Sequence, residues 1–165
     1  MQGASEQLDF NTNHFTKDHI REFERYNKFE KTRCAQHFDN AAINYDGVYL
    51  RAGYPDPWKC AEFVDDLTKE MGLGKDAEIL DLACGTGLVG QALNEKGFSN
   101  IYGCDISEKM LEIASTKDVY RSLDQVELGQ EDFIGTFPIP YKARFDFVTC
   151  AGFLNNNQVA EEIFE

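Results

Sequence analysis

Three glycines and one aspartate form the pattern in this sequence that could carry chemistry. Gly85, Gly87 and Gly90 follow an apolar run with the spacing Gly-x-Gly-x-x-Gly, and Asp105 ends the next apolar run. Glycine permits backbone angles and close approaches that a side chain forbids, so such a turn can press against a ligand, and the following helix points free N–H groups there. An acid about 20 residues further on is placed to bind the ribose hydroxyls of an adenosine-containing cofactor. The pattern therefore predicts a cofactor site of this kind.

The residues before the glycines bear on which cofactor binds. The glycine spacing alone also satisfies the dinucleotide fingerprint. Here, however, Asp81 closes the strand, and Ala83 and Cys84 intervene before Gly85. A carboxylate at that point would repel a pyrophosphate but suits a ligand that carries positive charge, such as a sulfonium and an amino group. Capping of the turn is the alternative role for Asp81, and capping of the next helix is the alternative for Asp105.

Several motifs together point to a family. With Asp81-Leu-Ala-Cys-Gly-Thr-Gly87 and Gly103-Cys-Asp-Ile-Ser107, the chain resembles the class I S-adenosylmethionine methyltransferases. The run from Lys117 to Gln130, together with Phe145-Asp-Phe-Val and Ala151-Gly, is similar to the Williams–Beuren-region methyltransferase-like branch. The resemblance implies S-adenosylmethionine as cofactor and an α/β fold with a Rossmann-like, doubly wound, mostly parallel sheet.

The resemblance also implies positions for the cofactor. Asp81 would face its methionine end and Asp105 its ribose. Ile106 and Met110 would sandwich the adenine, with core packing as the alternative for both. Gln130 stands where the family commonly has an acid for the adenine amino group, and the two acids after it are alternatives. The predicted cofactor-binding residues are Asp81, Ala83, Gly85, Thr86, Gly87, Asp105, Ile106, Met110, Gln130, Ala151 and Tyr45.

The substrate side is predicted from fewer residues. Tyr45 and Tyr54 resemble aromatic positions of an N-terminal lid that excludes water from the methionine end, with loop packing as the alternative. Tyr54, Phe153 and Asn155 are predicted to face the substrate. The segment around Asn155 lacks the Asn/Asp-Pro-Pro-Tyr sequence of enzymes that methylate amides or adenine N6, which argues against those substrates. The sequence identifies no catalytic base and predicts no metal site.

An alternation of strands and helices would position these residues. Near-continuous apolar strands in β-α-β-α order predict a parallel sheet covered on both faces, with its ligand crevice at the carboxyl ends of the strands. A helix over 16–38 and a loop over 45–57 are expected before it. The predicted strands are 78–84, 100–105, 126–128 and 145–150, and the predicted helices between them are 88–95 and 108–116. The chain divides into a disordered tail (1–13), a helical lid or cap (14–72) and a cofactor-binding core (73–165).

The composition of the chain limits which substrates it is expected to bind and where in the cell it is expected to lie. The formal net charge of −13 would repel a phosphate backbone, so nucleic acid is not the expected substrate unless a local basic patch overrides it. The five cysteines form no Cys-x-x-Cys pair, which favours a reducing cytoplasm over a disulfide framework. No apolar run approaches the length of a membrane span, so no membrane association is expected.

The family's sheet normally continues beyond the fourth strand, so this chain is expected to lack the last strands. The strand at 145–150 would then be an apolar edge that a partner or a second copy could cover. The leading hypothesis is methyl transfer from S-adenosylmethionine to a small acceptor. A non-catalytic S-adenosylmethionine-binding or interaction module is the first alternative, and an NAD-dependent oxidoreductase is the second.

Overall fold

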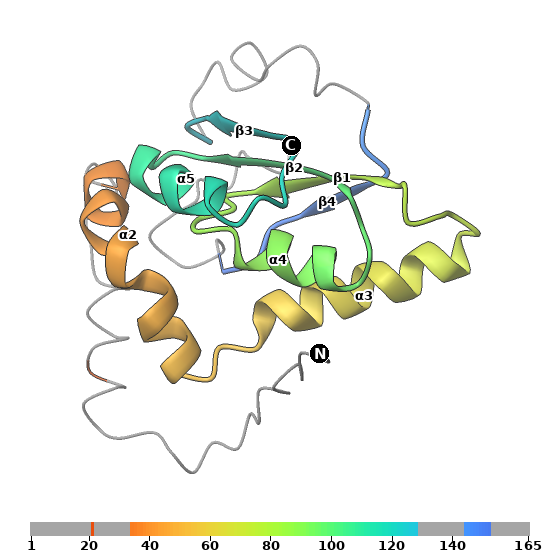
Figure 1. The fold of residues 1–165 in the computed structure, drawn as a ribbon, viewed down its shortest axis with the longest axis horizontal. Helices are drawn as coiled ribbons and strands as arrows, with labels where there is room; N and C mark the ends of the chain where they lie inside the picture. Colours follow the sequence, from red (N-terminus) through yellow and green to blue (C-terminus); the bar gives the residue numbers. More distant parts are fainter. Residues whose placement is uncertain (1–20, 22–33, 129–143, 153–165) are drawn as a thin grey trace, which may run out of the picture.

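A computed structural model describes residue 21 and residues 34–128 and 144–152 of the chain. Four strands form one sheet in the order β3-β2-β1-β4, and each neighbouring pair is parallel (Figure 1). This confirms the predicted Rossmann-like, mostly parallel sheet. The strands are β1 (Glu78–Leu82), β2 (Asn100–Asp105), β3 (Ser122–Gln125) and β4 (Phe147–Thr149).

The register brings the carboxyl ends of the strands to one edge of the sheet. Asp81 of β1 pairs with Gly103 on one side and with Thr149 on the other, and Asp105 pairs with Gln125 of β3. In a parallel sheet the turns that follow the strands meet along that edge, which is where ligands bind in open α/β folds. The glycine turn and Asp105 therefore lie side by side.

Helices α4 (Leu88–Glu95) and α5 (Glu108–Ser115) connect β1 to β2 and β2 to β3. Both right-handed crossovers run in the same direction along the sheet, so the two helices cover the same face. The predicted bounds of α4 are confirmed, and α5 ends one residue before its prediction. The predicted cover of the other face of the sheet stays a prediction.

Between residues 34 and 77, helices α2 (Cys34–Arg51) and α3 (Asp56–Glu70) precede the sheet. In α2, Ala41 and Ala42 pack against Met110 of α5, and α3 lies along α4 (Figure 1). The predicted loop over 45–57 is wrong in its first half, because α2 continues to Arg51. Val48 and Tyr49 are buried in this stretch and Tyr45 packs on the cluster between α2 and α5, so tertiary packing overrides the loop signal of the glycine and aromatic residues.

Three strand predictions need correction. The first strand ends at Leu82, two residues before the predicted end. The third strand lies at Ser122–Gln125, not at 126–128, and the fourth covers only Phe147–Thr149 of the predicted 145–150. Polar β3 lacks an apolar run and is a strand because its backbone pairs with β2.

Strand β4 and the lengths of the helices relate to two predictions, a partner at the β4 edge and no membrane association. Val148 on β4 is 58% exposed, and the predicted partner for this edge stays a prediction. Within the described ranges, every helix is too short or too polar to cross a bilayer.

Candidate cofactor site

The turn between β1 and α4 has an unusual backbone. Ala83, Gly85 and Gly87 all have positive φ angles, of 52°, 55° and 87°. This conformation is strained for alanine, and such strain gathers at functional sites. A Cβ atom placed on Gly85 would meet no atom within 4 Å, so the turn is open there. The turn can therefore bring its backbone close to a ligand at Gly85.

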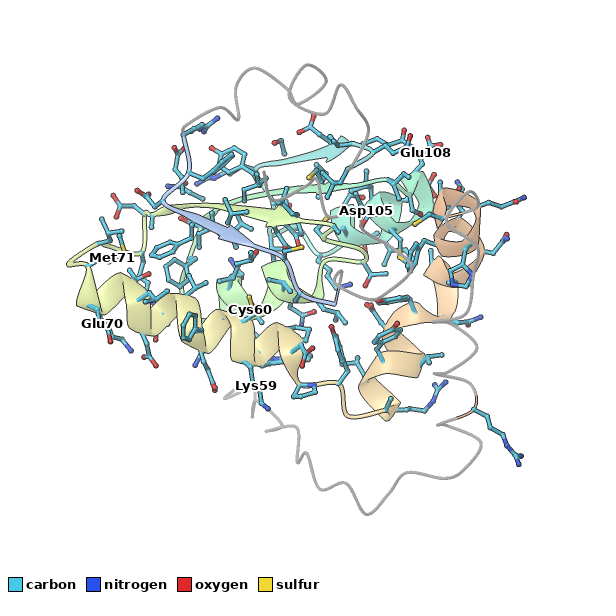
Figure 2. The ribbon with its side chains drawn as sticks, turned by 180° about the vertical axis from the view of Figure 1, so that it is seen from behind. Lys59, Cys60, Glu70, Met71, Asp105 and Glu108 are labelled. Atoms are coloured by element: carbon cyan, nitrogen blue, oxygen red, sulfur yellow. The ribbon has the colours of Figure 1, made fainter. Side chains whose placement is uncertain are left out.

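Asp105 ties this turn to the next one. One oxygen of its carboxylate accepts a hydrogen bond from the Gly85 N–H at 2.9 Å, and the other accepts from the Ser107 N–H, also at 2.9 Å. Figure 2 shows Asp105 at the end of β2, near Glu108 at the start of α5. A carboxylate has about four acceptor positions, so it can bind ribose hydroxyls in addition to these two N–H groups. The predicted ribose role and the alternative capping role are compatible in this geometry.

Asp81, near the end of β1, is buried. It is 1% exposed, and its two oxygens accept hydrogen bonds from the Tyr120 hydroxyl at 2.7 Å and the Thr149 hydroxyl at 3.0 Å. Burial raises the pKa of Asp81 to about 7, against the opposing effect of these two hydroxyls. Its predicted contact with the methionine end of a cofactor is not tested by this geometry and stays a prediction.

The electrostatics of the site suit a cation. Burial also raises the pKa of Asp105, although the N–H groups of Ser107 and Gly85 act in the opposite direction. Within residues 34–128 and 144–152, neither Asp81 nor Asp105 forms an ion pair. A ligand that brings positive charge would stabilise both ionised carboxylates. Both acids accept hydrogen bonds without an ion pair in the described part of the chain, and the Asp81 carboxylate favours S-adenosylmethionine over a pyrophosphate cofactor.

The raised pKa of Asp81 predicts a particular pH dependence of stability. Between about pH 4 and about pH 7 the folded chain retains a proton on Asp81 that the unfolded chain has lost, so this group's contribution to stability falls as pH rises through that window. An asparagine side chain at this position would mimic the protonated acid. We therefore expect Asp81→Asn to leave the free energy of unfolding nearly unchanged at about pH 4 and to raise it by a few kcal/mol at most at about pH 8.

Urea unfolding at both pH values measures this difference. Asp66→Asn, at an exposed carboxylate on α3, is the matched control. A stability difference between Asp81→Asn and the parent chain that is the same at both pH values would contradict the assignment.

Tyr120 is the residue that the sequence interpretation missed. Its hydroxyl donates to Asp81 and accepts from the Gly90 N–H at 3.1 Å, and its ring fills the space that a Cβ on Gly90 would occupy. A Cβ on Gly87 would also press on this ring. Tyr120 thus requires glycine at position 90, whereas Gly87 is required by its positive φ and by contacts with both Tyr120 and Ala114; of the three glycines of the motif, Gly85 faces open space. The only signal in the sequence is the tyrosine of Lys117-Asp-Val-Tyr, which indicates a branch of the family but no contact with the glycine turn.

The two tyrosines predicted for a lid, Tyr45 and Tyr54, both contact Tyr49, and the lid role itself stays a prediction. Tyr45 stacks on Tyr49 with ring centroids 4.0 Å apart, and Tyr49 meets Tyr54 edge-on at 5.1 Å. The Tyr54 hydroxyl lies against Gly152, just after β4. Burial raises the pKa of both Tyr45 and Tyr54, so both phenols retain their protons at neutral pH and neither is a base there.

Three further residues predicted to bind the cofactor lie in the described part of the chain, and their environments differ. Met110 is 1% exposed within the cluster between α2 and α5. The Ile106 carbonyl accepts a hydrogen bond from the Gln125 side chain at 2.9 Å, and Ala151 packs on the main core. The other three predicted positions lie outside the described residues, so their roles stay predictions; they are Gln130, Phe153 and Asn155.

The cysteines offer no activated nucleophile in the described part of the chain. Burial raises the pKa of Cys34 and Cys60 to about 11 and that of Cys104 and Cys150 to about 12, and it raises the pKa of Cys84 well above its ordinary value. Each of these groups is therefore a neutral thiol at physiological pH. The described residues also contain no cluster of side chains suited to a metal ion.

The strand order 3-2-1-4, a glycine turn after β1 and an acid at the end of β2 define a Rossmann-like fold with a candidate nucleoside site. The sequence model of the family described as "Methyltransferase domain" matches residues 79–165. The chain belongs to this methyltransferase family. This confirms the predicted fold class and, at the level of the family, the prediction of a methyltransferase with S-adenosylmethionine as its cofactor; it disfavours the nicotinamide alternative.

Similar proteins carry related names. Human methyltransferase-like protein 27 is 42% identical over 124 residues, which are 74% of this chain and 47% of that protein. The ribosomal protein L11 methyltransferase of Caldanaerobacter subterraneus subsp. tengcongensis is 31% identical over 78 residues, 47% of this chain and 24% of that protein. A solved S-adenosylmethionine-dependent methyltransferase from Clostridium acetobutylicum is 29% identical, with a TM-score of 0.49, over 68% of this chain and 43% of that one. The chain thus spans about half the length of such relatives, or less.

Proposed function

We propose that this chain binds S-adenosylmethionine and supports methyl transfer to a small-molecule acceptor that is uncharged or cationic. The observation that carries the proposal is the open, positive-φ turn at Gly85, hydrogen-bonded to the buried carboxylate of Asp105. A net charge of −13 supports an acceptor other than nucleic acid. The five free cysteines support the cytoplasm as its location.

The chain's own residues would act by binding and orientation. When bound, S-adenosylmethionine supplies a methyl group activated by attachment to a positively charged sulfur. Asp105 would hold the ribose, the backbone at Gly85 would contact the cofactor closely, and the field of Asp81 would favour its positive end. Tyr45 and Tyr54 would exclude water from the carboxyl edge of the sheet. Placing the acceptor in line with the methyl group would supply most of the rate effect, since this transfer needs little covalent help.

Calorimetric titration of the chain with S-adenosylhomocysteine, with NADH in a parallel cell, tests this function. We expect micromolar binding of S-adenosylhomocysteine and no heat from NADH, because the carboxylate of Asp81 opposes a pyrophosphate. A circular dichroism melt shows that the chain is folded in the same buffer. Binding of NADH alone would overturn the proposal in favour of an oxidoreductase. Binding of neither ligand by a folded chain would favour the interaction-module alternative.

A further inference from the structure

Helix α2 contacts the glycine turn through three polar residues, which we call the Asp46–Thr86–Lys117 junction. Asp46 accepts hydrogen bonds from the Thr86 hydroxyl and from the Lys117 ammonium, the latter at 2.7 Å. Lys117 also donates to the Thr86 carbonyl at 2.7 Å. The ion pair between Asp46 and Lys117 therefore binds both the hydroxyl and the carbonyl of the residue that follows Gly85.

Neither side chain of the Asp46–Lys117 pair is more than 30% exposed, whereas the lysine of both pairs within α3, Lys69, is 65% exposed. Thr86 is 1% exposed, and the side chains of Lys117 and Asp46 are 14% and 30% exposed. By comparison, Lys69 pairs with Asp66 on α3 while both side chains are more than half exposed. Exposed pairs contribute little, whereas removal of one partner of a sequestered pair leaves a charge without compensation. Loss of Asp46 or Lys117 should therefore disturb Thr86 strongly.

A second acid on α2 contacts the next turn. Asp39 lies seven residues before Asp46, two helical turns away, so both point to the same side of α2. Asp39 accepts from the Ser107 hydroxyl at 2.6 Å and from the Lys109 N–H at 3.2 Å, at the start of α5. Figure 1 shows α2 beside α5. Helix α2 is thus attached to both turns that the Asp105 carboxylate joins.

We propose that the Asp46–Lys117 pair positions the cofactor turn and couples the docking of α2 to cofactor binding. Thr86 is adjacent to Gly85, so the pair that holds Thr86 also sets the backbone that the ligand contacts. Coupling between two binding events is reciprocal: if docked α2 raises the affinity for the cofactor, bound cofactor holds α2 in place. This inference rests on the proposed function. Asp46 and Lys117 are positioning residues in it, since both act through Thr86.

A double-mutant cycle in the affinity for S-adenosylhomocysteine tests the coupling. We expect Asp46→Ala and Lys117→Ala each to weaken binding about tenfold, and the double variant to be no weaker than either single one, because each removes the same pair. Lys117→Arg should retain most of the affinity. Arg144→Ala is the matched control: it breaks a pair with Glu78 at the opposite, amino end of β1 and should leave the affinity unchanged.

Hydrogen exchange distinguishes coupling from a purely structural role of the Asp46–Lys117 pair, because a purely structural role would not make amide exchange in α2 depend on the ligand. In the parent chain, S-adenosylhomocysteine should slow exchange of the amides of α2, and this slowing should disappear in Asp46→Ala. Unchanged affinity in both single variants, or losses that simply add in the double variant, would overturn the coupling alone. If the variants do not fold, equal exchange of α2 with and without ligand in the parent chain would overturn it. A folded parent chain that does not bind S-adenosylhomocysteine would overturn the proposed function and the coupling together.

Discussion

Asp105→Ala is expected to lower the affinity for S-adenosylhomocysteine about 100-fold or more. Hydrogen bonds to a charged group are worth about 1.5–3 kcal/mol each, and alanine would lose those to both ribose hydroxyls. The Gly85 and Ser107 N–H groups would lose their acceptor at the same time, so the turn itself would loosen. Calorimetric titration measures the affinity, and a thermal melt separates lost binding from lost folding.

Two further variants make this result specific. Asp105→Asn keeps one acceptor oxygen and should weaken binding less than alanine does. Glu112→Ala removes a negative charge from the exposed surface of α5, where Glu112 pairs with Lys109, and should leave binding unchanged. Equal affinity of the parent chain and Asp105→Ala would show that Asp105 serves only the turn.

Tyr120→Ala is expected to produce the largest loss of stability, on the order of 3–5 kcal/mol in the free energy of unfolding. The ring packs on the main core and fills the space beside Gly90 and Gly103. Its loss would open a cavity and leave the buried Asp81 carboxylate without the Tyr120 hydroxyl. Tyr120→Phe keeps the ring and should lose about 1–3 kcal/mol, since Asp81 and the Gly90 N–H each lose a partner. Urea unfolding measures both variants.

Gly90→Ala provides the matched test of this packing. In the parent chain its methyl group would overlap the Tyr120 ring, so the substitution should be strongly destabilising. In the Tyr120→Ala background the space is free, and the same methyl group should be tolerated or even stabilising on α4. Strictly additive effects of the two substitutions would mean that Tyr120 is not the reason for glycine at position 90.

The local pattern predicted the strands and helices around the glycine motif well. The bounds of β2 and α4 agree with the prediction, and Ser107 caps α5, with its hydroxyl accepting from the Met110 N–H at 3.1 Å. These elements have continuous apolar runs, glycine stops or a short-range cap, and all of these signals lie within a few residues of the structure that they determine. The sequence also predicted that Asp105 lies next to Gly85, because the carboxyl ends of parallel strands meet at a common edge of the sheet.

By itself, the sequence determined the family, the parallel sheet, and the turn and acid of the cofactor site, since these depend on local residue spacing. The tertiary structure alone decided the rest. Strand β3 is polar and exists through pairing with β2, and the last turns of α2, up to Arg51, bury Val48 and Tyr49. Tyr120, Asp46 and Lys117 meet their partners over 30 to 71 positions of the chain. Contacts of that separation leave no periodic signal, because the side chains that form them are brought together only when the sheet and its helices pack.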